Sequence, residues 1–452
     1  MLMLLLACPG PGEPDGTDGD SAGPADAIEI SASTAGAWLS AQAESQFGGW
    51  ITAGLLEGLP AVLVGAQQAR LGESGYGAAF VYTDPLAGGA VATSSLYSSF
   101  GIEVGSGGCL GGDLDGDGVD DVVVGSREWT GPATRGAGAA YVMPGPLPAT
   151  VDLAVQGHHI RGRSEGDLLG VAASCGSDTS GDGIGDLILG ARKADTGDDD
   201  AGAAYLFAGP VDGDRAPSDA LVAILGNEPG GGLGRALDIR GDLDGDGLAD
   251  MVVGAYLESL NASHGGAAFV VNGGTTGTII AADADAALGD DHGQTSFGRA
   301  VNSRDDLDGD GLADLLVGAP GSGDGQAGAT YVFSKPMGLQ DTSAALISVT
   351  AAEDGDWAGY AVATGDINGD GNTDLVVGRP GDHGDNDNTT LAGRLCVVFG
   401  PRVGSVDRCD VVYVGENIGD SFGIAVEAVD LDGDGAAEIV AGAFGASAAY
   451  VF

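Results

Sequence analysis

An acidic nine-residue loop recurs along this 452-residue chain and constrains its fold more than any other feature. The clearest copy, Asp113–Asp121, reads Asp-Leu-Asp-Gly-Asp-Gly-Val-Asp-Asp. Further copies begin at Asp178, Asp242, Asp306, Asp366 and Asp430. The first aspartates of successive copies are 60 to 65 residues apart. This regular spacing predicts a repeat architecture in which each unit carries one loop.

The loops have the composition of a site for a hard divalent cation. Oxygen-bearing side chains stand at positions 1, 3, 5 and 9, and glycine at position 6 permits a tight turn. With the backbone carbonyl of position 7 completing each set, we expect about six structural Ca²⁺ sites. The expected ligands are Asp113, Asp115, Asp117, Val119, Asp121, Asp178, Ser180, Asp182, Ile184, Asp186, Asp242, Asp244, Asp246, Leu248, Asp250, Asp306, Asp308, Asp310, Leu312, Asp314, Asp366, Asn368, Asp370, Asn372, Asp374, Asp430, Asp432, Asp434, Ala436 and Glu438.

Two loops depart from the pattern in ways that predict weaker binding. Ser180 brings no charge to position 3, and Glu438 at position 9 has a longer reach than aspartate. An EF-hand begins with a similar loop, but it needs a glutamate at position 12 and flanking helices. Position 12 is apolar in every copy, as at Val124 and Leu189, so the EF-hand interpretation fails.

The segments between the loops predict an all-β chain. Each unit opens with an aromatic residue or leucine followed by glycine, such as Phe100-Gly101 or Phe297-Gly298. After the acidic loop come two short apolar runs and a closing apolar segment, for which Val151–Val155 and Leu221–Leu225 are candidates. A further copy near Phe47 has Ala53, Leu55, Glu57 and Ala61 at the loop positions and so cannot bind metal by this scheme. The chain therefore predicts seven units of four strands each.

Seven four-stranded units fit a closed seven-bladed β-propeller. The apolar runs lack alternation because stacked blades bury both faces of each sheet. The last unit ends at Phe452, directly after its third strand. We therefore expect an N-terminal strand, Ala27–Ser31, to complete the last blade and close the ring.

The phenylalanine-glycine opening, the acidic loop and the run Val317-Gly318-Ala319-Pro320 resemble FG-GAP repeats. Such repeats build the seven-bladed propeller of integrin alpha-subunit heads and of many bacterial surface proteins. The resemblance covers residues 27 to 452. It implies that calcium lies in the loop between the first two strands of a blade, on the lower face, and that ligands meet the upper face.

The N-terminus, Met1 to Cys8, resembles a bacterial lipoprotein signal with Cys8 as the lipidated residue, although it is short and lacks basic residues. A plain secretory signal or a chance apolar start are the alternatives. We expect a signal segment over residues 1–8, a flexible tether over 9–25 and the propeller over 26–452. Four further cysteines in an exported protein predict two disulfides, Cys396–Cys409 and Cys109–Cys175.

The net charge of −49 comes from 66 acidic and 17 basic residues. Six bound Ca²⁺ ions would leave about −37, which argues against nucleic acid or an anionic membrane surface as a partner. A basic and aromatic group expected on the upper face is the exception, and it suits an anionic ligand. It comprises Arg127, Trp129, Arg161, Arg163 and Arg192, with His158 and His159 in the same expected loops. Local charge balance is the alternative explanation.

The sequence shows no zinc-ligand spacing, no nucleophile elbow and no Walker-type loop. We therefore expect no catalysis. The predicted function is recognition or adhesion by an exported monomer at the bacterial outer membrane or cell surface, with a periplasmic or secreted protein as the alternative. The expected partner is an extracellular protein or glycan. A carbohydrate-binding or carbohydrate-active propeller and a purely structural envelope component remain alternative functions.

Overall fold

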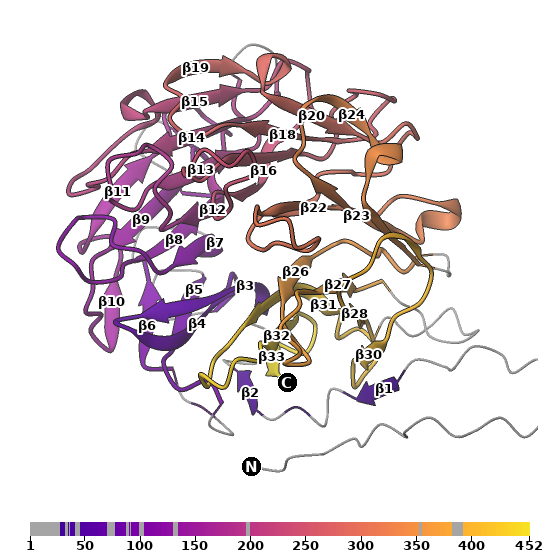
Figure 1. Cartoon of the computed structure of the whole chain (residues 1–452). Helices are drawn as coiled ribbons and strands as arrows, with labels where there is room; N and C mark the ends of the chain where they lie inside the picture. Colours follow the sequence, from indigo (N-terminus) through magenta and orange to yellow (C-terminus); the bar gives the residue numbers. More distant parts are fainter. Residues whose placement is uncertain are drawn as a thin grey trace, which may run out of the picture.

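The computed structural model describes residues 28–31, 35, 37–40, 46–69, 77–86, 90, 92–98, 104–129, 134–195, 199–351, 355–381 and 392–452. These residues form seven β-sheets around a central axis, which confirms the predicted seven-bladed propeller (Figure 1). Helical structure among them is limited to short 3-10 turns at Pro217–Asp219 (η2), Ala281–Asp283 (η3), Asp324–Gln326 (η4) and Thr342–Ala344 (η5). None of these turns is long and apolar enough to cross a membrane.

Each blade is built on four antiparallel strands, of which the first lines the central channel. The first blade contains β3 (Phe47–Leu56), β4 (Leu59–Ala66), β5 (Ala78–Tyr82) and β6 (Ser94–Tyr97). The second contains β7 (Val104–Leu110), β8 (Val122–Ser126), β9 (Ala139–Met143) and β11 (His158–Arg161). The third contains β12 (Leu169–Cys175), β13 (Leu187–Ala191), β14 (Ala203–Phe207) and β15 (Val222–Leu225). The fourth contains β16 (Leu233–Asp238), β17 (Met251–Ala255), β18 (Ala267–Val271) and β20 (Ala286–Gly289).

The remaining three blades follow the same order. The fifth contains β21 (Ala300–Asn302), β22 (Asp314–Ala319), β23 (Ala329–Ser334) and β25 (Ile347–Thr350). The sixth contains β26 (Val362–Gly365), β27 (Asp374–Arg379), β28 (Arg394–Val398) and β30 (Val411–Val414). The seventh contains β31 (Phe422–Val429), β32 (Glu438–Ala443) and β33 (Ala448–Val451), and its outer strand is β2 (Ala37–Ser40).

The expectation of four strands per blade is incomplete, because five of the sheets gain a fifth, parallel strand. In each case the segment that precedes the outer strand of one blade pairs with the outer strand of the preceding blade. These added strands are β10 (Thr150–Asp152) on β6, β19 (Gly277–Ile280) on β15, β24 (Gly338–Asp341) on β20, β29 (Gly404–Val406) on β25 and β1 (Ile28–Ser31) on β30. Neighbouring blades are therefore hydrogen-bonded to each other at the rim.

One consequence corrects the predicted strand at Val151–Val155. That segment supplies the added strand β10 of the first blade, and the outer strand of the second blade is β11 instead. His158, His159 and Arg161 therefore belong to a strand at the rim, whereas the sequence predicted that they lie in upper-face loops. The predicted outer strand at Leu221–Leu225 is confirmed as β15.

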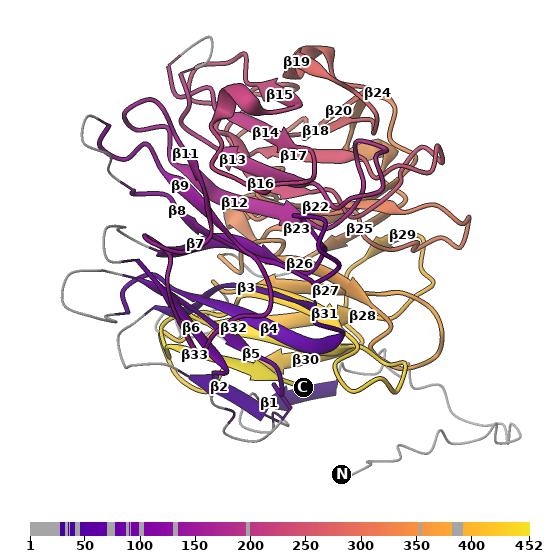
Figure 2. The same cartoon turned by 90° about the vertical axis from the view of Figure 1, so that its left-hand side faces the viewer.

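The N-terminal segment closes the ring, but not through the strand that was predicted. Ala27–Ser31 was expected to complete the last blade, yet β1 pairs with β30 of the sixth blade. The outer strand of the seventh blade is β2, in which Ala37 pairs with Val451 and Ser40 with Ala448. The two strands lie beside their C-terminal partners in Figure 2. Closure by an N-terminal strand is thus confirmed, and its position is corrected.

Contact between neighbouring blades depends on paired glycines. The glycine of each opening motif approaches the glycine near the end of the second strand in the preceding blade. A Cβ added to Gly190 would lie 2.0 Å from the oxygen of Gly234, and one added to Gly254 would lie 2.1 Å from that of Gly298. In the second blade the motif is Val104-Gly105, and Phe100-Gly101 lies outside the described residues. Apolar clusters fill the remaining space between sheets, as where Phe47 of the first blade joins Val440 of the last.

Both predicted disulfides are present. Cys109–Cys175 joins β7 to β12 and so links the second and third blades, with a Cα–Cα distance of 5.9 Å. Cys396–Cys409 lies within the sixth blade, with a Cα–Cα distance of 5.3 Å.

Candidate metal loops and the central channel

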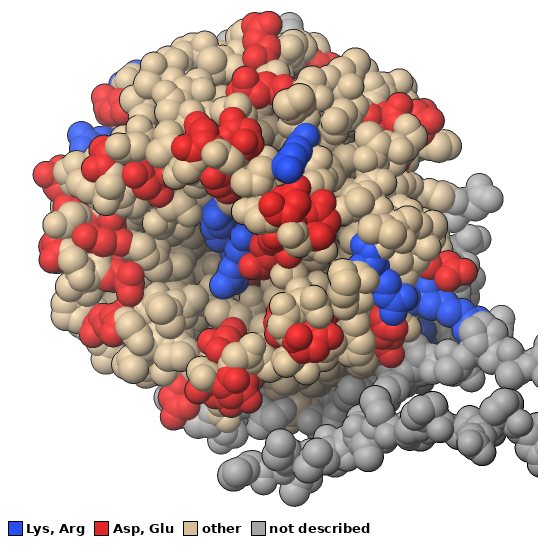
Figure 3. Space-filling model, in the orientation of Figure 1, with Lys and Arg blue, Asp and Glu red and all other residues tan. Residues whose placement is uncertain are grey.

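The six acidic loops join the first and second strands of blades two to seven and therefore share one face of the ring, here called the loop face. Acidic side chains gather at several places around the ring in Figure 3. The loop at Asp113–Asp121, for example, runs from the end of β7 to the start of β8. Strands flank the loops on both sides, which agrees with the exclusion of an EF-hand.

The first aspartate of each loop organises the backbone around it. Asp113 Oδ1 accepts a hydrogen bond from the Gly116 amide at 2.7 Å, and Oδ2 accepts one from the Gly118 amide at 2.9 Å. The same bond from the position-6 amide recurs in the other five loops at 2.7–3.0 Å. The six loops therefore share one turn conformation, which is stabilised by the first aspartate.

The acid at position 9 connects the loop to the blade. Asp121 is buried, and its carboxylate accepts hydrogen bonds from the amides of Leu114 at 2.8 Å and Gly145 at 3.1 Å. Gly145 follows the third strand, so the carboxylate bridges two turns of its blade. Burial raises the pKa of the Asp121 carboxyl to about 6, although these hydrogen bonds oppose the shift. A cation at this point would favour the charged carboxylate and offset its loss of hydration.

The carboxylates are close enough to share one ion in four of the loops. In each cluster, one oxygen per acid lies within 4.8 Å of the others. The clusters are Asp113, Asp115 and Asp121; Asp242, Asp244 and Asp246; Asp306, Asp308 and Asp314; and Asp430, Asp432 and Glu438. Three anionic oxygens at this separation fit a Ca²⁺ ion, which takes several oxygen ligands. In the loop that begins at Asp178, Ser180 Oγ lies 3.3 Å from Asp186 Oδ1. The serine hydroxyl therefore faces the carboxylate of position 9, as a metal ligand would.

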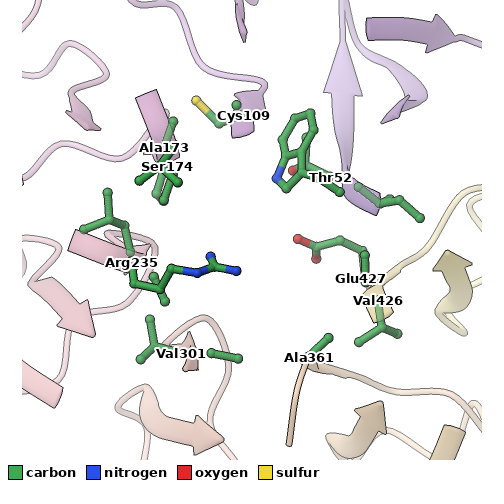
Figure 4. Close-up of a pocket in the computed structure, with 18 of the residues that line it drawn as sticks. Thr52, Cys109, Ala173, Ser174, Arg235, Val301, Ala361, Val426 and Glu427 are labelled. Carbon is green, nitrogen blue, oxygen red and sulfur yellow. The ribbon is translucent and has the colours of Figure 1, made fainter. Parts of the chain in front are cut away.

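The second feature is a central cavity of about 890 Å³. Among the described residues, its wall carries six arginines and one acid, which are Arg127, Arg192, Arg235, Arg240, Arg299, Arg304 and Glu427. Figure 3 shows basic side chains within the central hollow, surrounded by an acidic surface. In Figure 4, Arg235 extends from one wall towards the open centre, and Glu427 lies on the opposite wall.

The two ends of this cavity differ in their charge pairing. At the loop-face end, Arg240 Nε donates to Asp238 Oδ1 at 2.8 Å, and Arg240 Nη1 lies 3.7 Å from Glu427 Oε2. Burial opposes ionisation of Asp238, but Arg240 holds the pKa of its carboxyl below the usual value. The amide of Ser303 also donates to Asp238 at 2.8 Å. This network links blades four, five and seven.

The opposite end holds arginines without such partners. Arg235 lies near the start of β16, Arg299 directly precedes β21, and Arg192 directly follows β13. The acidic loops join the other ends of these strands, so all three arginines lie away from the loop face. Between described residues, none of these three side chains forms an ion pair with a carboxylate. The guanidinium carbon of Arg299 lies 3.9 Å from the ring centre of Tyr360. Burial, Arg299 and Arg192 together lower the pKa of Arg235.

The structure separates the residues predicted to bind an anion. Arg127 and Arg192 line the cavity. Trp129 packs against the apolar cluster between the first two blades, and Arg161 pairs with Asp214 at 2.9 Å on the outer strand β11. Arg163 is exposed.

Sequence reasoning missed Arg235, Arg299 and Tyr360, which directly follow the glycine of the opening motif. A usable signal existed, because the residue at this position lines the cavity in all seven blades. The seven residues are Gly49, Ser106, Val171, Arg235, Arg299, Tyr360 and Ile424.

The ring of blades and its loop face define a β-propeller whose repeats each carry one candidate metal site. The FG-GAP repeat matches residues 104–143, 234–271, 297–333 and 358–392, which cover blades two, four, five and six. "Integrin alpha pat-2" of Caenorhabditis elegans is 29% identical over 257 residues, or 53% of this chain and 20% of that protein. "Integrin alpha-10" of Homo sapiens is 33% identical over 171 residues, or 36% of this chain and 14% of that protein. "Integrin alpha-5" of Xenopus laevis is 29% identical over 171 residues, or 36% of this chain and 16% of that protein.

The chain is therefore a β-propeller that contains FG-GAP repeats and is similar to integrin alpha subunits over part of its length. The matches span a fifth or less of these relatives, so the resemblance concerns one domain of much longer proteins.

Proposed function

We propose that this chain is an exported recognition or adhesion module whose propeller is stabilised by calcium and performs no catalysis of its own. The observation that carries the proposal is one acidic loop repeated in six blades of an integrin alpha-like propeller, with three carboxylates close enough to share an ion in four of these loops. Repetition at every loop favours a role in stability, because a catalytic metal needs only one specialised site.

Calcium would be held by the ligands at positions 1, 3, 5 and 9, with the carbonyl of position 7. When bound, it supplies positive charge that relieves repulsion among the three or four acids of each loop. In four loops the buried position-9 acid would then transmit this stabilisation to its blade, because the carboxylates of Asp121, Asp186, Asp250 and Asp374 also accept a hydrogen bond from an amide that follows the third strand. A site at ten times its Kd contributes about 1.4 kcal/mol.

Export is supported by the two disulfides, which persist in oxidising environments. The proposed lipidation site Cys8 lies outside the described residues. An anchor there would place the propeller at the bacterial outer membrane or cell surface. The proposed partner is an extracellular protein or glycan bound by a monomeric propeller.

Thermal unfolding with calcium, with magnesium and with EDTA tests the metal's role. We expect EDTA to lower the Tm markedly and calcium to restore it, with Asp306→Asn giving a smaller loss than chelation because five loops remain. Lys193→Gln, remote from the loops, is the control. An unchanged Tm in EDTA would refute calcium stabilisation. Capture of partners from surface extracts, with and without calcium, then tests recognition, and a glycan panel identifies a carbohydrate ligand.

A further inference from the structure

We propose that the end of the central channel opposite the loop face is a binding site for an oxyanion. The site is formed by the arginine cluster, defined here as Arg192, Arg235 and Arg299, with Tyr256 and Tyr360 beside it. This inference rests on the proposed recognition role, since it names the chemistry of one ligand that the propeller would take.

Arginine is concentrated in the central cavity. Six of the 17 basic residues of the whole chain line this one cavity. Arginines on a strongly acidic protein would lower its free energy by pairing with the abundant surface carboxylates. Their convergence on a shared cavity, where Glu427 is the one acid among the described lining residues, leaves excess positive charge there.

The two ends of the cavity differ in how far their arginines are neutralised. Arg240 is neutralised by Asp238 and Glu427, so the loop-face end has little affinity left for an anion. The arginine cluster has no matching carboxylates among the described residues. Burial, and after it the like charges of Arg299 and Arg192, lower the pKa of Arg235, and Arg299 and Arg235 lower that of the Tyr360 hydroxyl against the effect of burial. The cluster thus holds uncompensated positive charge that an oxyanion would neutralise.

The size of the cavity and the access to it also suit an anionic ligand. A cavity of about 890 Å³ has the volume of a small-molecule site or of the tip of an inserted peptide. The cluster lies at the ends of strands remote from the acidic loops, so an anion can approach without crossing the loop face. Planar guanidinium groups bind carboxylate, sulfate and phosphate oxygens in pairs, and the tyrosines add ring edges and hydroxyls.

The test uses the calcium-loaded full chain and titration calorimetry at matched ionic strength. Sulfate, succinate and a hexaglutamate peptide are the probes, with chloride as the reference ion. The double variant Arg235→Gln/Arg299→Gln removes the cluster's centre. Arg402→Gln is the matched control, because Arg402 pairs with Asp410 in the sixth blade and does not line the cavity.

We expect the wild type to bind at least one probe and the double variant to bind it at least tenfold more weakly, with Arg402→Gln unchanged. Arg235→Lys, which keeps the charge, should retain part of the affinity. Without any probe, the double variant should have a higher Tm than the wild type, because like-charge repulsion is relieved. This readout also shows that the variant is folded.

The probes distinguish the source of the oxyanion. Stronger binding of hexaglutamate than of succinate assigns the site to an acidic segment of a partner, and similar affinities for all probes assign it to a small free anion. Failure of every probe to bind the wild type, or equal binding by the double variant, would overturn the inference. If surface partners are still captured in that case, the recognition role stands and the channel is not its anion site.

Discussion

Gly442 of the last blade packs against the backbone of Gly48 of the first, so closely that a Cβ on Gly442 would lie 2.0 Å from the Gly48 oxygen. The same pairing recurs between consecutive blades around the ring, as between Gly318 and the oxygen of Gly359. The contact across the closure is therefore equivalent to the contacts within the chain. A sheet stacked this closely has no room for even one methyl group.

Replacing Gly442 with alanine should destabilise the ring closure. The added methyl meets backbone rather than a movable side chain, so strands must separate, at a cost of about 1–3 kcal/mol. Gly213→Ala is the matched control, because a Cβ there has nothing within 4 Å and its φ is not positive. The measurement is the urea midpoint of both variants. Equal midpoints would show that the glycine contact does not limit blade stacking.

Removal of the N-terminal strands should open the ring. A chain beginning at residue 45 lacks β2, which carries the fully buried Leu39 and covers the edge of β33. We expect a much lower Tm and aggregation through the exposed edge. A chain beginning at residue 35 loses only β1 and should lose less stability, and one beginning at residue 26 should match the full chain. If the chain beginning at residue 45 melted at the same temperature as the chain beginning at residue 26, closure by β2 would be contradicted.

The two disulfides should differ in their contribution to stability. Cys109–Cys175 spans a sequence separation of 66, and Cys396–Cys409 spans 13. On the loop-entropy model the first contributes about 4 kcal/mol and the second about 3 kcal/mol, both as upper estimates. Paired cysteine-to-alanine variants compared by urea unfolding would rank them. A larger loss from the shorter loop would show that strain or local packing outweighs chain entropy.

The loops and the number of blades could be predicted because their signals are local. The residues that form each acidic turn lie within nine positions of the sequence. The number and regular spacing of the repeats give the number of blades. The closing strand was misplaced because Ile28–Ser31 and Ala37–Ser40 are both four-residue strands with apolar residues and no signal that ranks them. Which one joins the last blade depends on contacts with partners more than 380 residues away.

The channel could not be predicted for a related reason. Arg235, Arg299 and Tyr360 converge only after three repeats are aligned in register around the axis, whereas their local sequences look like ordinary strand starts. Arg127 and Arg192 were selected for their charge, and the structure brings them to the same cavity. Arg161 was selected on the same basis but lies on β11, because a short parallel strand at Thr150–Asp152 precedes the outer strand of that blade.

A pair of neighbouring carboxyls, one of them buried, predicts a pH dependence separate from metal binding. Glu258 is buried after β17, and burial together with the neighbouring Glu228 raises the pKa of its carboxyl to about 8. In the unfolded chain the pKa is near 4.5, so between these values the folded state binds more protons than the unfolded state. The contribution of Glu258 to stability is therefore present below about pH 4.5 and is lost as the pH rises to about 8.

Glu258→Gln removes this ionisation while it keeps the side-chain size. At saturating calcium, the Tm of the variant minus that of the wild type should grow from pH 5 to pH 9 and then level off. Glu228 acts in the opposite sense. Burial raises the pKa of its carboxyl, but hydrogen bonds from Ser259 outweigh this effect and lower the pKa. Glu228→Gln should therefore cost stability at neutral pH. Glu165→Gln, at an exposed position, is the control and should leave the pH profile unchanged. A difference for Glu258→Gln that stays constant across this pH range would show that the buried carboxyl does not titrate there.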